Sequence, residues 1–116
     1  MTAVIVLPFA PSTNQLWRAN GRRVYRSKKY TDWMDECGYA LQQQTPLPFF
    51  DEPVSISIKI GRPDKRRRDL DNFATKAVFD ALVHYRILED DSLVHRFTAQ
   101  WDEGITGIQV EIEEIL

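Results

Sequence analysis

The hydrophobic positions of the chain repeat with two periods, one typical of strands and one typical of helices. An apolar run at residues 4–7 predicts a buried strand, and alternating apolar and polar residues predict strands at 54–60, 93–101 and 108–112. A turn signal at residues 102–104 separates the last two strands. These two strands are therefore expected to form an antiparallel hairpin.

Two amphipathic helices are predicted between the strands. Ser27 is a good N-cap, and apolar residues within 30–41 recur at the helical spacing i, i+3, i+4, i+7 before Pro46 stops the helix. The same spacing recurs within residues 74–85. Asn20-Gly21 is a strong turn signal, so we also expect a hairpin-like excursion ahead of the first helix.

These elements follow the order strand, helix, strand, helix, strand, strand, which indicates an α+β fold with two main helices on a mixed sheet. A chain of 116 residues supports one hydrophobic core without a separate functional module, so residues 1–116 are read as a single domain. Its only cysteine, Cys37, excludes an internal disulfide and a Cys-rich zinc site, and we expect it in the core.

No apolar stretch approaches the ~20 residues that a membrane span requires, so no membrane partner is expected. The apolar run at residues 4–7 is too short for a signal-peptide core and has no basic flank. A cytoplasmic location is therefore the default expectation.

The net charge of −2 conceals a marked asymmetry along the chain. Residues 1–68 carry 12 Lys and Arg against 6 Asp and Glu, whereas residues 69–116 carry 3 against 11. Charge alone favours a fold that pairs its own halves. The alternative is a surface that attracts phosphate beside carboxylates that hold a cation.

The stretch most informative about chemistry is the basic run at residues 62–68, which leads into Asp69-Leu70-Asp71. In extended backbone the two aspartates point to the same side and Leu70 points to the other. Magnesium prefers carboxylate oxygens, so a third carboxylate, from Asp91 or Asp90, would complete a phosphoryl-transfer site. The basic run would bring a DNA backbone to it through phosphate contacts.

Each part of this pattern also has a structural explanation. Asp71 is well placed to cap the helix that follows, the acidic turn at residues 89–91 is compatible with simple solvation, and residues 65–68 fit an exposed loop. The coincidence of acidic and basic groups at the ends of elements makes metal chemistry as favoured as these alternatives.

Three motifs occur in an order and spacing that resemble the RusA crossover-junction endodeoxyribonucleases. They are Arg-Arg-Arg-Asp-Leu-Asp-Asn at residues 66–72, Phe-Asp-Ala-Leu at 79–82 and Glu-Asp-Asp-Ser at 89–92. The opening Leu-Pro-Phe-Ala-Pro-Ser-Thr-Asn, residues 7–14, is similar to the first strand and Pro-rich loop of that family. The resemblance covers nearly the whole chain.

The resemblance implies a catalytic Mg²⁺ bound by three carboxylates, those of Asp69, Asp71 and Asp91. Asp90 is kept in reserve, because the spacing from Asp80 to Asp91 is the one expected of the family. Lys76 corresponds to the family's essential lysine, although it lies five residues after Asp71 rather than the usual four. An unbroken helix would turn it roughly 140° away, so we expect the extra residue to be absorbed before the helix begins.

The resemblance further implies a homodimeric, structure-specific endodeoxyribonuclease that resolves Holliday junctions by paired symmetric cleavage in DNA recombination and repair. Branched DNA is then its partner, and no small organic cofactor is expected. Seven basic residues are candidates for the DNA-facing surface, which are Arg22, Arg23, Lys28, Lys29, Arg66, Arg67 and Arg68. The alternative is that they are ordinary surface charges. Two rival functions remain, a phage-type nuclease for other branched or flap DNA and a catalytically inactive branched-DNA-binding protein.

Overall fold

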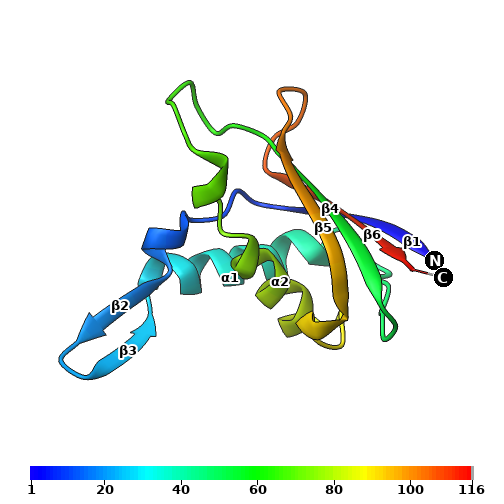
Figure 1. Cartoon of the computed structure of the whole chain (residues 1–116), viewed down its shortest axis with the longest axis horizontal. Helices are drawn as coiled ribbons and strands as arrows, with labels where there is room; N and C mark the ends of the chain where they lie inside the picture. Colours follow the sequence, from blue (N-terminus) through cyan, green and yellow to red (C-terminus); the bar gives the residue numbers. More distant parts are fainter. Residues whose placement is uncertain (116) are drawn as a thin grey trace.

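A computed structural model describes residues 1–115 of the chain. Two helices lie on one side of a four-stranded mixed sheet (Figure 1), which confirms the predicted α+β class. The sheet and its helices comprise β1 (Thr2–Leu7), α1 (Lys28–Gln42), β4 (Val54–Ile60), α2 (Thr75–His84), β5 (Val94–Trp101) and β6 (Ile108–Glu114). A separate hairpin and three single-turn 3₁₀ helices complete the chain: β2 (Trp17–Asn20), β3 (Arg23–Arg26), η1 (Thr13–Gln15), η2 (Leu70–Asn72) and η3 (Asp91–Leu93).

The strand order is β1-β6-β4-β5, with β6 antiparallel to both β1 and β4, and β5 parallel to β4. The predicted hairpin between the last two strands is therefore wrong, because β4 lies between them. The inward side chains of β4 are fully buried, which favours the central position for this strand. The loop from β5 to β6 crosses the end of β4. There Asp102 N donates to Ile60 O at 2.9 Å, and Gly61 N donates to Gly107 O at 2.8 Å.

The helices form as their sequence pattern predicts. The Ser27 side chain caps α1 by accepting from Tyr30 N at 3.1 Å, and the helix ends before Pro46. Cys37 lies in the core, as expected. Both helices bury their apolar faces against the sheet, and no helix among residues 1–115 is long and apolar enough to cross a membrane.

The two helices approach each other closely at Gly38 of α1. A Cβ at this position would lie 2.6 Å from the Tyr85 hydroxyl oxygen. That hydroxyl donates to Met34 O at 2.6 Å and so joins the end of α2 to α1. The absence of a side chain at Gly38 therefore allows this contact.

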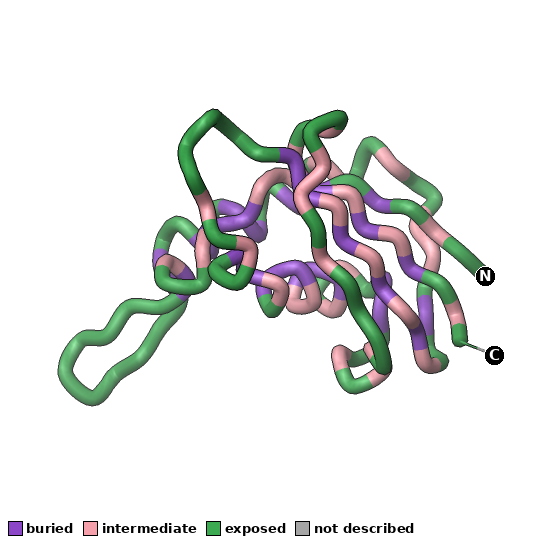
Figure 2. The backbone as a smooth tube through the Cα atoms, turned by 45° about the horizontal axis from the view of Figure 1, so that its top comes forward, coloured by how far each residue is buried: buried purple, intermediate pink, exposed green. Residues whose placement is uncertain are grey.

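The β2–β3 hairpin projects from the body of the molecule (Figures 1 and 2), and every residue of both strands is exposed. Its turn contains Gly21 with a φ of +64°, a conformation that glycine adopts without strain. This arrangement confirms the hairpin-like excursion that Asn20-Gly21 predicted. At its base, Ser27 N donates to Leu16 O at 2.9 Å, which ties the hairpin to the start of α1.

Candidate active site

Asp69 has extended backbone, but a 3₁₀ turn begins directly after it and contains Asp71. Asp69 is the N-cap residue of η2, where Asn72 N donates to Asp69 O at 3.2 Å. The argument that an extended chain aims both carboxylates to one side therefore fails, because the chain turns here as Leu70 packs against the core. Both side chains are exposed, and within residues 1–115 neither carboxylate forms a hydrogen bond or an ion pair.

The Pro-rich N-terminal loop holds η2 in place. The Thr13 hydroxyl donates to Asn72 O at 3.1 Å, and Ser12 forms an isolated bridge with Phe73. The Phe9 and Phe73 rings add an edge-to-face contact with centroids 6.3 Å apart. The two segments that carry the N-terminal and central motifs are thus joined.

The chain between Asp71 and Lys76 is not one continuous helix. Phe73 is extended, and α2 begins only at Thr75, with Ala74 as an N-cap that makes no side-chain hydrogen bond. Asp71 therefore does not cap α2. Because the chain from Asp71 to Lys76 is not one helix, the angle of an unbroken helix does not apply to Lys76.

Lys76 bridges carboxylates from two elements. Its ammonium nitrogen lies 2.8 Å from Asp91 Oδ2, on η3, and 3.1 Å from Asp80 Oδ1, one helical turn further along α2. Hydrogen bonds to Asp91 and then to Asp80 raise the pKa of Lys76, so it is a cation at neutral pH. Asp80 in turn accepts a hydrogen bond at 2.6 Å from the hydroxyl of Tyr30, on α1.

Asp90 and Asp91 have different environments. Asp90 caps η3 by accepting from Ser92 N at 2.9 Å, and hydrogen bonds from the side chain and then the backbone of Ser92 lower the pKa of its carboxyl. Asp91 instead faces Lys76. Asp90 therefore has a structural role as the cap of η3.

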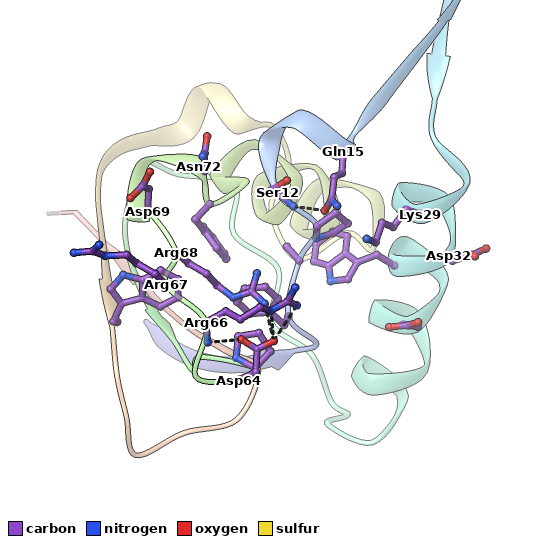
Figure 3. Close-up of a pocket in the computed structure, with 18 residues that line it drawn as sticks. Ser12, Gln15, Lys29, Asp32, Asp64, Arg66, Arg67, Arg68, Asp69 and Asn72 are labelled. Carbon is purple, nitrogen blue, oxygen red and sulfur yellow. Dashed lines mark hydrogen bonds and ion pairs between the residues drawn. The ribbon is translucent and has the colours of Figure 1, made fainter.

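A cleft of about 870 Å³ lies beside η2 (Figure 3). Asp69 lines this cleft. Its walls also include four of the basic residues predicted to face DNA, which are Lys29, Arg66, Arg67 and Arg68. Arg66 and Arg68 each lie 3.0 Å from Asp64, and chiefly because of the hydrogen bond from Arg66 the pKa of the Asp64 carboxyl is lowered to about 2. Asp64 thus restrains two of the three arginines.

Comparison with known proteins identifies the family of this chain. A model of the family described as "Endodeoxyribonuclease RusA" matches residues 8–113. The chain belongs to the RusA endodeoxyribonuclease family. The crossover junction endodeoxyribonuclease of Enterobacteria phage HK97 is 36% identical to it over 86 residues, or 74% of this chain and 71% of the relative.

Two further proteins named RusA are also similar to the chain. Crossover junction endodeoxyribonuclease RusA of Escherichia coli K12 is 37% identical over 93 residues, covering 80% of this chain and 77% of the relative. The protein of that name from Aquifex aeolicus is 24% identical over 104 residues, covering 88% and 82%. The protein is therefore a nuclease that hydrolyses phosphodiester bonds, and the RusA family implies a divalent metal cofactor.

The donor set fits such a cation in its chemistry. Asp69 and Asp71 offer carboxylate oxygens without other partners among the described residues, and Asp91 offers a third carboxylate. The three carboxylates do not lie close together in the structure. Within residues 1–115, no group of at least three acidic, His or Cys side chains is close enough to hold a metal. Asp91 is instead paired with Lys76.

The remaining basic candidates of this RusA protein do not line this cleft. Arg22 and Arg23 are exposed near the tip of the hairpin, and Lys28 pairs with Asp32 at 2.7 Å. The hairpin also exposes two arginines and two aromatic residues that were not among the sequence candidates, which are Trp17, Arg18, Tyr25 and Arg26. Their signal was present, since arginines and aromatic residues on both sides of a turn are typical of nucleic-acid contacts.

Proposed function

We propose that the protein is a Mg²⁺-dependent endonuclease that resolves four-way DNA junctions by paired symmetric cuts, in DNA recombination and repair. The observation that carries the proposal is the ion pair of Lys76 with Asp91, in a chain whose RusA motifs also include Asp69 and Asp71. The relatives are named crossover junction endodeoxyribonucleases, which supports branched DNA as the substrate.

Three carboxylates would hold the ion, those of Asp69, Asp71 and Asp91. When bound, Mg²⁺ supplies polarisation of the scissile phosphate and activation of the attacking water. Hydrolysis leaves a 5′-phosphate and a 3′-hydroxyl. The exposure of Asp69 and Asp71 keeps this part of the chain accessible to a DNA backbone.

Lys76 is the proposed source of positive charge for the reaction. Its ammonium group stabilises the negative charge that develops on the transferred phosphoryl group or on the leaving oxygen. Two carboxylates hold it at the start of α2, so its direction is set before the substrate arrives. An ammonium group held in this way loses less freedom on reaching the transition state than a free lysine would.

The cleft and the hairpin are the proposed DNA-binding surfaces. Arg66, Arg67 and Arg68 line the cleft beside Asp69, and Lys29 faces them from α1. Phosphate contacts from these groups would fix the position of the backbone over the carboxylates. Arg22 and Arg23 on the projecting hairpin, with Lys28 at its base, extend this basic surface.

A homodimer follows from the reaction. Two symmetric cuts in opposed strands require two equivalent sites, and a two-fold dimer presents them. One chain carries one copy of the motif Asp69, Asp71, Lys76 and Asp91. The pairing of cuts is therefore proposed to come from the pairing of chains.

Four Asp→Asn variants test the proposal in a single-turnover cleavage assay on a synthetic four-way junction. Asp69→Asn, Asp71→Asn and Asp91→Asn should abolish cleavage, because each removes ligand charge without adding bulk. Binding should persist or tighten as carboxylate repulsion falls. Asp90→Asn is the matched control, since it changes the neighbouring carboxylate that caps η3. If Asp90→Asn is inactive and Asp91→Asn cleaves normally, the assignment of Asp91 is wrong.

A further inference from the structure

Asp80 lies between Lys76 and the interior of the molecule, and each of its oxygens has a different partner. Oδ1 lies 3.1 Å from the Lys76 ammonium nitrogen, and Oδ2 accepts the Tyr30 hydroxyl hydrogen at 2.6 Å. The Asp80 side chain is 21% exposed, against 61% for Lys76. The contact therefore links an exposed lysine to a fixed group inside the fold.

Tyr30 is held firmly enough to act as that fixed group. It is fully buried on the first turn of α1, where its ring packs edge-to-face on Trp17, with centroids 6.0 Å apart. The Arg26 guanidinium lies 5.0 Å from the ring centre. Burial and then the hydrogen bond to Asp80 raise the pKa of the Tyr30 phenol, which keeps it a hydrogen-bond donor.

Asp91, the second carboxylate partner of Lys76, has two competing roles. Asp91 contacts Lys76 at 2.8 Å, and it is also one of the three proposed metal ligands. A carboxylate that coordinates a cation has less negative charge to offer an ammonium group, and the cation repels the ammonium directly. Asp80 is not a proposed ligand, so its contact with Lys76 persists when the contact with Asp91 weakens.

We propose that Asp80, oriented by Tyr30, is a positioning residue that retains Lys76 beside the site when Asp91 turns to the metal. The inference rests on the proposed function of Lys76 and Asp91. It assigns Asp80 a second effect, which is to draw Lys76 away from Asp91 and so to favour metal binding. Without Asp80, Lys76 has Asp91 as its one carboxylate partner among the described residues.

Metal affinity gives a test that does not depend on turnover. Mn²⁺ binding to the full chain, measured by calorimetry, should weaken about threefold or more in Asp80→Asn, the range expected for one exposed ion pair. In a Lys76→Ala background the same Asp80→Asn change should have no effect, because the competitor of the metal is gone. An equal loss of affinity in both backgrounds would overturn the proposal, since Asp80 would then act through its own charge.

Tyr30→Phe tests the orienting hydroxyl while keeping the packed ring. Its single-turnover rate on a four-way junction should fall roughly tenfold, a smaller loss than that of Lys76→Ala. Tyr85→Phe is the matched control, because it deletes a hydroxyl that also donates at 2.6 Å, to Met34 O. This control should cleave at the wild-type rate.

The outcomes separate this proposal from the proposed function. A Tyr30→Phe rate equal to that of Tyr85→Phe would overturn the positioning role. A further loss when Tyr30→Phe is added to Lys76→Ala would also overturn it, because the tyrosine would then act by another route. A normal rate for Lys76→Ala alone would contradict the proposed function itself, and the Mn²⁺ measurement would still decide whether Asp80 holds Lys76 away from Asp91.

Discussion

Lys76 is the residue whose charge and position the proposed mechanism uses most directly. Its ammonium group is exposed, so as an ordinary surface lysine it would change stability by no more than about 0.5 kcal/mol on replacement by alanine. As a group that stabilises the transition state it should instead lower the cleavage rate by a hundredfold or more, about 3 kcal/mol.

The corresponding measurement is the single-turnover cleavage rate of Lys76→Ala on a synthetic junction. Junction binding and thermal stability should remain close to wild type, because the fold does not depend on an exposed ion pair. A rate within threefold of wild type would remove Lys76 from the mechanism.

At the scale of single residues, the sequence identified the charged groups but not their partners. Tyr30 belongs to the apolar face of the helix that was predicted from the spacing within residues 30–41. Its hydroxyl contacts Asp80, 50 residues further along the chain, and no local pattern reveals such a contact. The predicted geometry of Asp69 and Asp71 was wrong because the extended backbone ends at Asp69 and a 3₁₀ turn contains Asp71.

The loop between β4 and η2 is the element through which the protein should meet phosphate. Replacing Arg66, Arg67 and Arg68 together with alanine should weaken junction binding and flatten its salt dependence by up to about three contacts, each worth ~0.9 in the log-log slope. Folding should change little, because these side chains lie at the cleft surface. Binding titrations over a range of salt concentrations measure the slope, and an unchanged slope would show that the run faces solvent.

The contact between α1 and α2 gives a test of the fold. Gly38→Ala should destabilise the protein by about 1–3 kcal/mol, because the new Cβ would lie 2.6 Å from the Tyr85 hydroxyl oxygen. At an exposed helical site the same change would stabilise the helix by about 1 kcal/mol. Urea denaturation measures the difference.

The matched variant for this test is Tyr85→Phe, which deletes the nearest atom. In the Tyr85→Phe background, Gly38→Ala should cost less than it does alone. Equal costs in the two backgrounds would show that the clash is not with the hydroxyl.

At the scale of elements, the helices were predictable and the sheet order was not. A helix reveals itself through the spacing of its own residues, and the Ser27 cap and both apolar faces were found in this way. Strand order depends on which strand buries the most apolar surface, and the turn signal at residues 102–104 carries no information about β4. The loop it lies in crosses the end of β4 instead of closing a hairpin.

The whole molecule combines opposite charges in one small body. The positively charged first part supplies the hairpin and the arginines of the cleft, whereas the negatively charged second part supplies Asp69, Asp71 and Asp91. The structure brings part of these two sets together at the cleft, where Asp69 lies among the arginines. An ion pair between Arg62 and Glu103, at 3.2 Å, joins the two parts of the chain, whereas the pairs of Asp64 with Arg66 and Arg68 lie within the first part.

The proposed paired cuts require two copies of the chain. Light scattering of the free protein should give a mass of about twice the 13.5 kDa of one chain. Dilution to the monomer should uncouple the two incisions, so that nicked junctions accumulate. A monomer that makes paired cuts at all concentrations would contradict the dimeric mechanism.

Cleavage of a synthetic four-way junction, beside a linear duplex and a flap of matched sequence, tests the central claim most directly. With Mg²⁺, the protein should make symmetric cuts in two opposed strands of the junction and leave the duplex and the flap largely intact. With EDTA, or with the Asp69→Asn variant, no cleavage should occur. Equal cleavage of flap or linear duplex, or cleavage of the junction in EDTA, would contradict the account of a metal-dependent junction resolvase.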